Sequence, residues 1–266
     1  MRFRRGLGAP IAALSPAVSS YDADAAAYFA RMSTQEPDAF KTAVNAYIVG
    51  LKADGLWSLI DRLGVSAVTT EANALYCLRQ ASKVFARIGS TTFTSTKGIN
   101  LVDATGGWTL NENPDAAGNA YTELSGSFAV YCNLTDNVGA SRVPHFGGVA
   151  ASRTSYYAHA AGSENARINQ TSDSTNVRTS VTRLGLRAGS RTGGTTTRYY
   201  FNGAFTTAHT TASAPPNATH ATVGRDGANF TNDRFAVQMT GQGMSDGQQA
   251  AFNTRTVTLL TALGAN

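Results

Sequence analysis

The chain has 266 residues, 42% of them hydrophobic, which is enough to bury a sizeable core in one large domain or in two. Its apolar segments are short, such as YIVGL at 47–51, and fall below the roughly 18 consecutive apolar residues that a membrane-spanning helix needs, so we expect no membrane insertion. The formal net charge is +5, but the basic residues are scattered rather than gathered in a stripe, which argues against binding of nucleic acid.

Residues 1–20 form a basic segment, MRFRRGLGAPIAALSPAVSS, that superficially resembles a secretion signal. Pro10 and Pro16 interrupt its weakly apolar run, so we interpret it instead as an extended arm. Arg2, Arg4 and Arg5 are the candidate residues through which this arm contacts an acidic partner subunit. The alternative is a frayed terminus.

Residues 21–86 are rich in Ala and Leu and are predicted to form a helical subdomain. The predicted helices are 24–32, 38–52 and 71–79, with a further turn at 57–63. The second has the clearest helical spacing of apolar residues: Phe40, Val44, Tyr47, Ile48 and Leu51. Thr69 or Thr70 is the expected cap of the third helix.

Residues 87–244 change to a composition of Thr, Ser, Gly and Asn, and the hydrophobic period changes to two. Phe128, Val130 and Cys132 alternate with other residues, which predicts a strand with one wet and one dry face. Frequent Gly and Pro turn signals separate many short runs of this kind. This pattern favours an antiparallel β-sandwich or jelly roll over alternating strands and helices.

The stretch TRYYFNGAFTTA places aromatic residues on both sides of Asn202-Gly203. Asn and Gly accept the positive φ angles of a type I′ turn, so we predict a β-hairpin. Tyr199, Phe201 and Phe205 are then expected to pack across the two strands.

Residues 245–266 are predicted to be a C-terminal helix that packs back on the body of the protein. Ser245 is a plausible N-cap, with Gln248 three residues later, and Gly264 is the expected stop. The helix is expected to cover either the N-terminal helices or one end of the sandwich.

Residues for catalysis or metal binding are not evident in the sequence. The acidic residues of the predicted sandwich form no closely spaced pair on one strand, as glycan hydrolysis would require, and the four histidines lack metal-ligand spacing. We therefore predict no enzymatic activity, no catalytic residue, no metal and no cofactor. Cys77 and Cys132 are expected to be buried free thiols, with a disulfide as the alternative.

Aromatic residues offer the candidate binding surface. Tyr156, Tyr157 and Trp108 are the candidate platform on which sugar rings stack, since the apolar faces of sugars suit exposed aromatic rings. The competing interpretation is core packing, because alternation along a strand turns one tyrosine of each adjacent pair inward.

Several segments, in order along most of the chain, resemble phage and prophage virion-associated proteins that carry a concanavalin A-like (laminin G-like) jelly roll. The segments are AAYFARMS (26–33), AYIVGLKADGLWSLIDRL (46–63), TTEANALYCLRQ (69–80), TTFTSTKGINL (91–101), RYYFNGAF (198–205), VGRDG (223–227) and RFAVQMTGQGMSDGQQAAFNTRTVTLLTALGA (234–265). The resemblance implies a mainly β fold, a concanavalin A-like antiparallel sandwich with an N-terminal helical subdomain and a closing C-terminal helix.

The same resemblance implies a function. We expect a non-enzymatic structural component of a phage or phage-like particle, in a tail, fibre, spike or head decoration, made in the bacterial cytoplasm and located in the virion. Its expected partners are other virion proteins and further copies of itself, since particles repeat their components. The alternative is a receptor-binding module that recognises a carbohydrate on the host surface.

Overall fold

The fold comes from a computed structural model that describes residues 21–101, 107–109, 114–135, 143–147, 153–158, 163–172, 174–179, 182–216, 222–223, 225–226 and 229–266. The arm residues Arg2, Arg4 and Arg5 lie outside these ranges. Within them, no helix has both the length and the apolar character needed to cross a bilayer.

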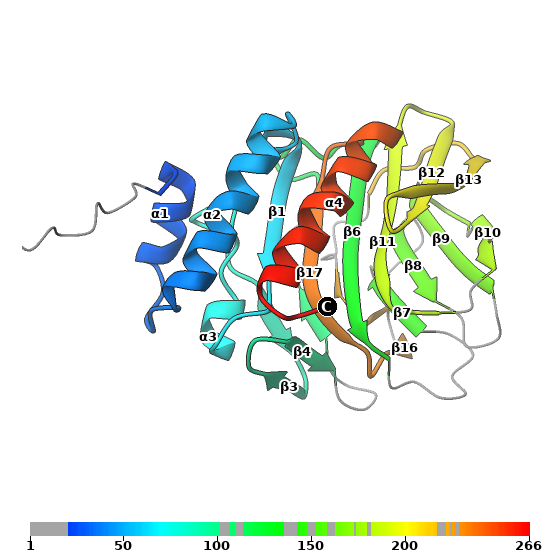
Figure 1. Cartoon of the computed structure of the whole chain (residues 1–266). Coiled ribbons are helices and arrows are strands. Elements are labelled where there is room, and N and C mark those ends of the chain that lie inside the picture. Colours follow the sequence, from blue (N-terminus) through cyan, green and yellow to red (C-terminus); the bar gives the residue numbers. More distant parts are fainter. Residues whose placement is uncertain are drawn as a thin grey trace, which may run out of the picture.

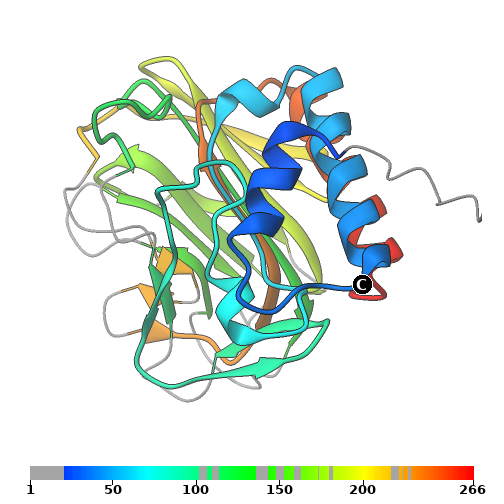
Figure 2. The same ribbon diagram turned by 90° about the vertical axis from the view of Figure 1, so that its left-hand side faces the viewer.

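Two antiparallel sheets and a layer of helices stack face to face (Figures 1 and 2). In the described residues, the first sheet has eight strands. Its spatial order is β13 (Ala204–Thr210), β12 (Thr196–Phe201), β11 (Gly185–Thr192), β6 (Ser125–Leu134), β17 (Arg234–Gly241), β4 (Gly98–Leu101) and β3 (Thr91–Thr94), and β1 (Ile60–Val65) also pairs with β17.

The second sheet has seven strands in the described residues and lies behind the first in Figure 1. Its order is β10 (Ser174–Thr179), β9 (Ser163–Gln170), β8 (Arg153–Ala158), β7 (Val143–Gly147), β14 (Thr222–Val223), β5 (Gly107–Thr109) and β2 (Ala86–Ile88). A separate two-stranded ribbon joins β15 (Arg225–Asp226) and β16 (Asn229–Phe230). The predicted fold class, a mainly antiparallel β-sandwich with helices near both ends of the chain, is confirmed.

The inner faces of the two sheets meet in a close-packed core. Gly189 of β11 allows this approach, because a Cβ atom there would lie 2.7 Å from Phe128 and 2.8 Å from Ile168 of the opposite sheet. Those distances are shorter than van der Waals contact, so a larger residue would force the side chains of Phe128, in the neighbouring strand, and Ile168, in the opposite sheet, to shift. The sandwich therefore has no room for a ligand between its sheets at this position.

Helices cover the outer face of the eight-stranded sheet, as Figure 2 shows edge-on. α1 (Ala23–Ala30) and α2 (Asp38–Ala53) come from the predicted helical region, and α4 (Asp246–Ala262) is the predicted C-terminal helix. Ser245 and Gln248 form the reciprocal bonds of a capping box at the start of α4, and Tyr47 of α2 hydrogen-bonds to Thr256 of α4 at 3.0 Å. The C-terminal helix thus packs on α2 and on the sheet together.

This helical layer corrects one expectation. Strand β6 was predicted to have one wet and one dry face, yet Ala129 and Val130, which point to opposite faces, are both fully buried. The outer face is dry because α4 lies over the sheet (Figure 1). Hydrophobic alternation weakens wherever both faces of a strand are covered.

A second correction concerns residues 57–63, predicted as a helical turn. Only Trp57–Leu59 is helical, as a short 3₁₀ turn, and the chain then continues as β1, which pairs with β17. The helix predicted at 71–79 is also shorter, since α3 spans Glu71–Ala74 and Cys77 then forms a bridge with Gly64. Backbone pairing with the sheet replaces helix in both segments, and the chain enters the sheet well before its composition changes.

The Asn202-Gly203 hairpin is confirmed. Asn202 has φ 49° and Gly203 has φ 77°, the left-handed conformations of a type I′ turn, and β12 pairs with β13 around them. The Asn202 side chain also accepts a hydrogen bond from the Leu186 backbone N–H at 2.9 Å. This bond ties the tip of the hairpin to the start of β11.

Candidate functional site

The three residues predicted as a sugar-stacking platform lie inside the protein. Tyr156 and Tyr157 are completely buried and Trp108 is 2% exposed, so the expectation of an exposed platform is corrected. β8 runs in the middle of its sheet, and Tyr156 points between the sheets, where its ring centroid lies 5.9 Å from that of Phe128. Tyr157 points to the other face, which is also covered at that position.

Tyr156 belongs to a group of polar and aromatic side chains between the sheets, which we call the buried cluster: Tyr156, Glu164, Arg178, Arg187 and Phe201. The Tyr156 hydroxyl donates to Glu164. Arg187 donates to the same carboxylate from Nε at 3.1 Å and Nη2 at 2.8 Å, and Arg178 donates at 3.1 Å. Both guanidinium groups also lie over the Phe201 ring, 3.4 Å (Arg178) and 5.4 Å (Arg187) from its centroid.

The buried cluster joins the two sheets, because Tyr156, Glu164 and Arg178 come from one and Arg187 and Phe201 from the other. Burial raises the pKa of Glu164, but the Arg187 charge, the Tyr156 hydrogen bond and the Arg178 charge outweigh it and hold the pKa below its ordinary value. Glu164 is therefore ionised, with hydrogen bonds to both of its oxygens. One oxygen accepts from Tyr156 and the other from the two arginines, so the group serves as a link between the sheets.

A second group with the same chemistry lies on the outer face of the hairpin, and we call it the surface cluster: Arg198, Tyr200, Phe205 and Asp246. Arg198 donates to Asp246 from Nε at 2.8 Å and from Nη2 at 2.6 Å, a bidentate ion pair. The Tyr200 hydroxyl donates to the same carboxylate at 2.8 Å. The Arg198 guanidinium lies 4.2 Å from the Phe205 ring centroid, and Phe205 meets the Tyr200 ring edge-on at 6.2 Å.

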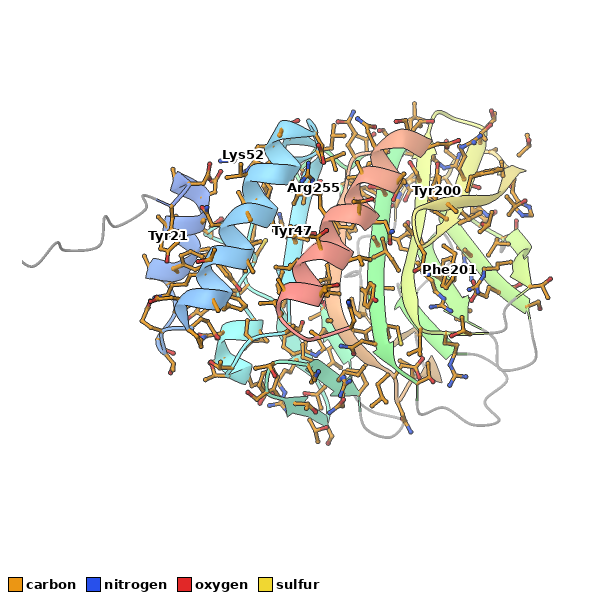
Figure 3. The ribbon with its side chains drawn as sticks, in the orientation of Figure 1. Tyr21, Tyr47, Lys52, Tyr200, Phe201 and Arg255 are labelled. Atoms are coloured by element: carbon orange, nitrogen blue, oxygen red, sulfur yellow. The ribbon has the colours of Figure 1, made fainter. Side chains whose placement is uncertain are left out.

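Two elements position this cluster. Tyr200 and Phe205 are direct cross-strand partners around the Asn202-Gly203 turn, which places both rings on one face of the sheet. The capping box fixes Asp246 at the first position of α4, so its carboxylate lies beside β12. Figure 3 shows Tyr200 on the side of α4 away from α2.

The electrostatics keep both charges of the ion pair. The hydrogen bond from Arg198 lowers the pKa of Asp246, and the bond to Asp246 raises the pKa of Arg198. Burial raises the pKa of Tyr200, with the bond to Asp246 adding to the shift, so its hydroxyl remains a donor. Arg198 and Asp246 therefore both stay charged over a wide pH range, and their charges cancel.

Exposure distinguishes the surface cluster from the buried one. Phe205 is 45% exposed and is the most exposed aromatic residue among those whose burial is described. The side chains of Arg198 and Asp246 are 34% and 51% exposed. An apolar ring beside solvent-facing donors and acceptors is the combination that a sugar contacts with its apolar face and its hydroxyl groups.

The surface cluster was not predicted from the sequence, although the hairpin motif contains Arg198, Tyr200 and Phe205. The hairpin motif places Phe205 opposite Tyr200, and the cap motif places Asp246 at the start of a helix. Neither motif tells that the helix starts beside the hairpin, because residues 198–205 and 246 are brought together only by the fold.

Metal-ligating groups and thiols are also present in the part of the chain that the structure describes. There, no three His, Cys, Asp or Glu side chains lie close enough to hold a metal ion. Cys77 and Cys132 are both buried and unpaired with each other, as free thiols. Burial raises the pKa of Cys132 to about 12, with the Asp233 charge adding to the shift. A thiol of that kind is a poor nucleophile.

Comparison with known proteins finds similarity in structure alone. No family model and no curated protein sequence match the chain. The receptor-binding domain of botulinum neurotoxin mosaic serotype C/D matches with a TM-score of 0.56 and 10% identity, over 73% of this chain and 51% of that one. Botulinum neurotoxin type C, for which cell entry depends on two ganglioside molecules, matches with a TM-score of 0.52 and 11% identity, over 73% and 51%.

A mutant of Trypanosoma rangeli sialidase that displays trans-sialidase activity also matches, with a TM-score of 0.54 and 8% identity, over 82% of this chain and 39% of that one. These likenesses show the fold. The chain spans about half the length of the neurotoxin chains it matches, and it shares with them and with the sialidase a lectin-like β-sandwich.

Proposed function

We propose that this protein is a non-catalytic module that binds carbohydrate through the surface cluster. The observation that carries the proposal is the exposed Phe205 ring beside the Arg198–Asp246 ion pair, on the outer face of a lectin-like sandwich. The ganglioside dependence of a protein with this fold supports a glycan as the ligand class. In this proposal a sugar ring stacks on Phe205, and its hydroxyl groups bond to the ion pair.

The test is a glycan array followed by titration of the best ligand. Phe205→Ala is expected to weaken binding about two- to tenfold, because an aromatic contact contributes about 0.5–1.5 kcal/mol beyond its buried area. Leu124→Ala is the matched control, since Leu124 is 51% exposed and takes no part in the cluster. Equal losses in the two variants, or no ligand on the array, would count against the site.

The absence of catalysis is part of the same proposal. Its support is that two buried carboxylates are already hydrogen-bonded: Glu164 accepts bonds from Tyr156, Arg178 and Arg187, and Asp61 accepts bonds from the backbone N–H groups of Ala120 and Tyr121. Incubation with bacterial polysaccharides should release no product. Release of reducing sugar would overturn this part of the proposal while leaving binding intact.

The setting in a phage or phage-like particle is a second component, and its support is the sequence resemblance. In this setting the sandwich faces outward and residues 1–20 contact a neighbouring subunit through Arg2, Arg4 and Arg5. Locating the protein in a density map of intact particles tests it. A chain that lacks residues 1–20 is expected to lose incorporation, and unchanged incorporation would argue against the arm as the contact.

A further inference from the structure

The surface cluster carries one feature that bears on the kind of sugar it accepts: its charges cancel. Arg198 donates to Asp246 from Nε and from one N–H of Nη2, while Nη1 has no hydrogen bond to the described residues of the protein. Asp246 accepts three bonds, two from Arg198 and one from Tyr200, and its side chain is still 51% exposed. A ligand that lands on Phe205 therefore meets N–H donors and a carboxylate acceptor together.

A hydroxyl group suits that arrangement, because it donates and accepts at once. Two neighbouring hydroxyls of an uncharged sugar are able to donate to Asp246 and accept from Arg198. A carboxylate on the ligand only accepts, and it would have to approach an exposed carboxylate of the protein. The arginine that would attract it is already compensated, so the approach gains little from charge.

We propose that the surface cluster selects uncharged sugars over sugars that carry a carboxylate, and that Asp246 determines this selectivity. The inference rests on the proposed function and names its ligand class. It also separates this protein from what its fold suggests, since gangliosides, named for one structural neighbour, are acidic glycolipids.

The test compares matched glycans that differ by one sialic acid, such as lactose and 3′-sialyllactose, within a panel of such pairs at low salt. The wild-type protein is expected to bind the uncharged member about fivefold more tightly, the largest effect of one exposed charge pair. Asp246→Asn should reduce that ratio toward one or invert it, because Arg198 is then uncompensated. Arg198→Gln should raise the ratio, because Asp246 then keeps its bond from Tyr200 but loses its counter-charge.

The chain supplies a matched control in a second bidentate pair on α4. Arg255 donates to Asp54, at the end of α2, from Nε at 2.8 Å and from Nη2 at 3.0 Å, and among the described residues no exposed aromatic ring lies beside this pair. Figure 3 shows Arg255 on the α2 side of α4, opposite to Tyr200. Asp54→Asn changes the net charge by the same amount as Asp246→Asn and should leave the glycan ratio unchanged.

The outcomes separate the two proposals. Binding that depends on Phe205 but favours the sialylated member, or a ratio that Asp246→Asn does not move, overturns the selectivity and keeps the binding site. The opposite shift expected of Arg198→Gln provides a second reading if the first variant folds poorly. Binding of no glycan in the panel overturns both proposals.

Discussion

The buried cluster and the surface cluster contain the same chemical groups in different surroundings. Each has a carboxylate that accepts a tyrosine hydroxyl and an arginine, and each has an arginine stacked on a phenylalanine ring. They differ in exposure, since the Glu164 side chain is fully buried whereas the Asp246 side chain is 51% exposed. The comparison teaches that burial, and not residue type, separates a link between sheets from a group that is open to solvent.

The difference has an energetic side. Removing one partner of a buried ion pair leaves the other charge buried with neither a counter-charge nor water around it. This lowers the free energy of unfolding by about 3–5 kcal/mol. An exposed pair contributes about 0–1 kcal/mol because water and salt replace the partner. Stability should therefore depend on the buried cluster, and glycan binding on the surface cluster.

The largest expected effect tests that division directly. Glu164→Gln should lower the free energy of unfolding by about 3–5 kcal/mol, because Arg187 loses its counter-charge inside the protein. Asp246→Asn should lower it by about 1 kcal/mol or less. Urea unfolding at neutral pH measures both, and similar losses in the two variants would break the comparison.

The pH dependence of stability should follow the buried cluster. The folded pKa of Glu164 lies below its ordinary value of 4.5, so its contribution is fully present above that pH and is lost as pH falls through the folded pKa. Urea midpoints measured from pH 7 to pH 3 should fall at the acid end for the wild-type protein and fall less for Glu164→Gln. Since other carboxylates titrate in both proteins, parallel curves would contradict the assignment to Glu164.

The two phenylalanines provide a smaller contrast. Phe201→Ala should cost about 2 kcal/mol of stability, because the ring is partly buried under two guanidinium groups. Phe205→Ala should cost less than about 1 kcal/mol while it weakens glycan binding. Thermal unfolding and glycan titration of both variants measure these effects. A larger loss of stability in Phe205→Ala, or a larger loss of glycan binding in Phe201→Ala, would contradict the roles given to the two clusters.

The smallest expected effect is the reactivity of the thiols. Burial raises the pKa of Cys132 to about 12, with the Asp233 charge adding to the shift and the charge of Arg187, in the buried cluster, opposing it. A thiol reagent at pH 8 should label neither Cys132 nor Cys77 in the folded protein and both in urea. Rapid labelling of the native protein would show that the structure around the labelled thiol opens.

The sequence predicted much of this architecture because local signals decide those elements. The helical spacing from Phe40 to Leu51, the Ser245 cap and the Asn202-Gly203 turn each fix a structure within a few residues. Strand β1 had no such signal, since it is buried on both faces and pairs with a strand near the other end of the chain. Its backbone partner could not be read from its own residues.

The candidate site was harder to predict than the fold for a similar reason. Alternation tells which face of a strand Tyr156 and Tyr157 occupy, but not that both faces are covered at that position. The exposure of Phe205 depends on its place in β13, the last strand of its sheet, and the pairing of Arg198 with Asp246 depends on where α4 begins. Those are properties of the assembled layers.

The placement of β1 has a consequence for biosynthesis. β17 pairs along its first residues with β4 and along its remaining length with β1. Each of these two early strands therefore lacks one neighbouring strand until residues 234–241 have been synthesised. During translation, a nascent chain that stops short of β17 leaves β1 without its strand partner, and β4, which pairs with β3 on one side, is left with its other edge unpaired. The central sheet should therefore close late, after almost the whole polypeptide has left the ribosome, and truncation before residue 241 should yield chains that aggregate.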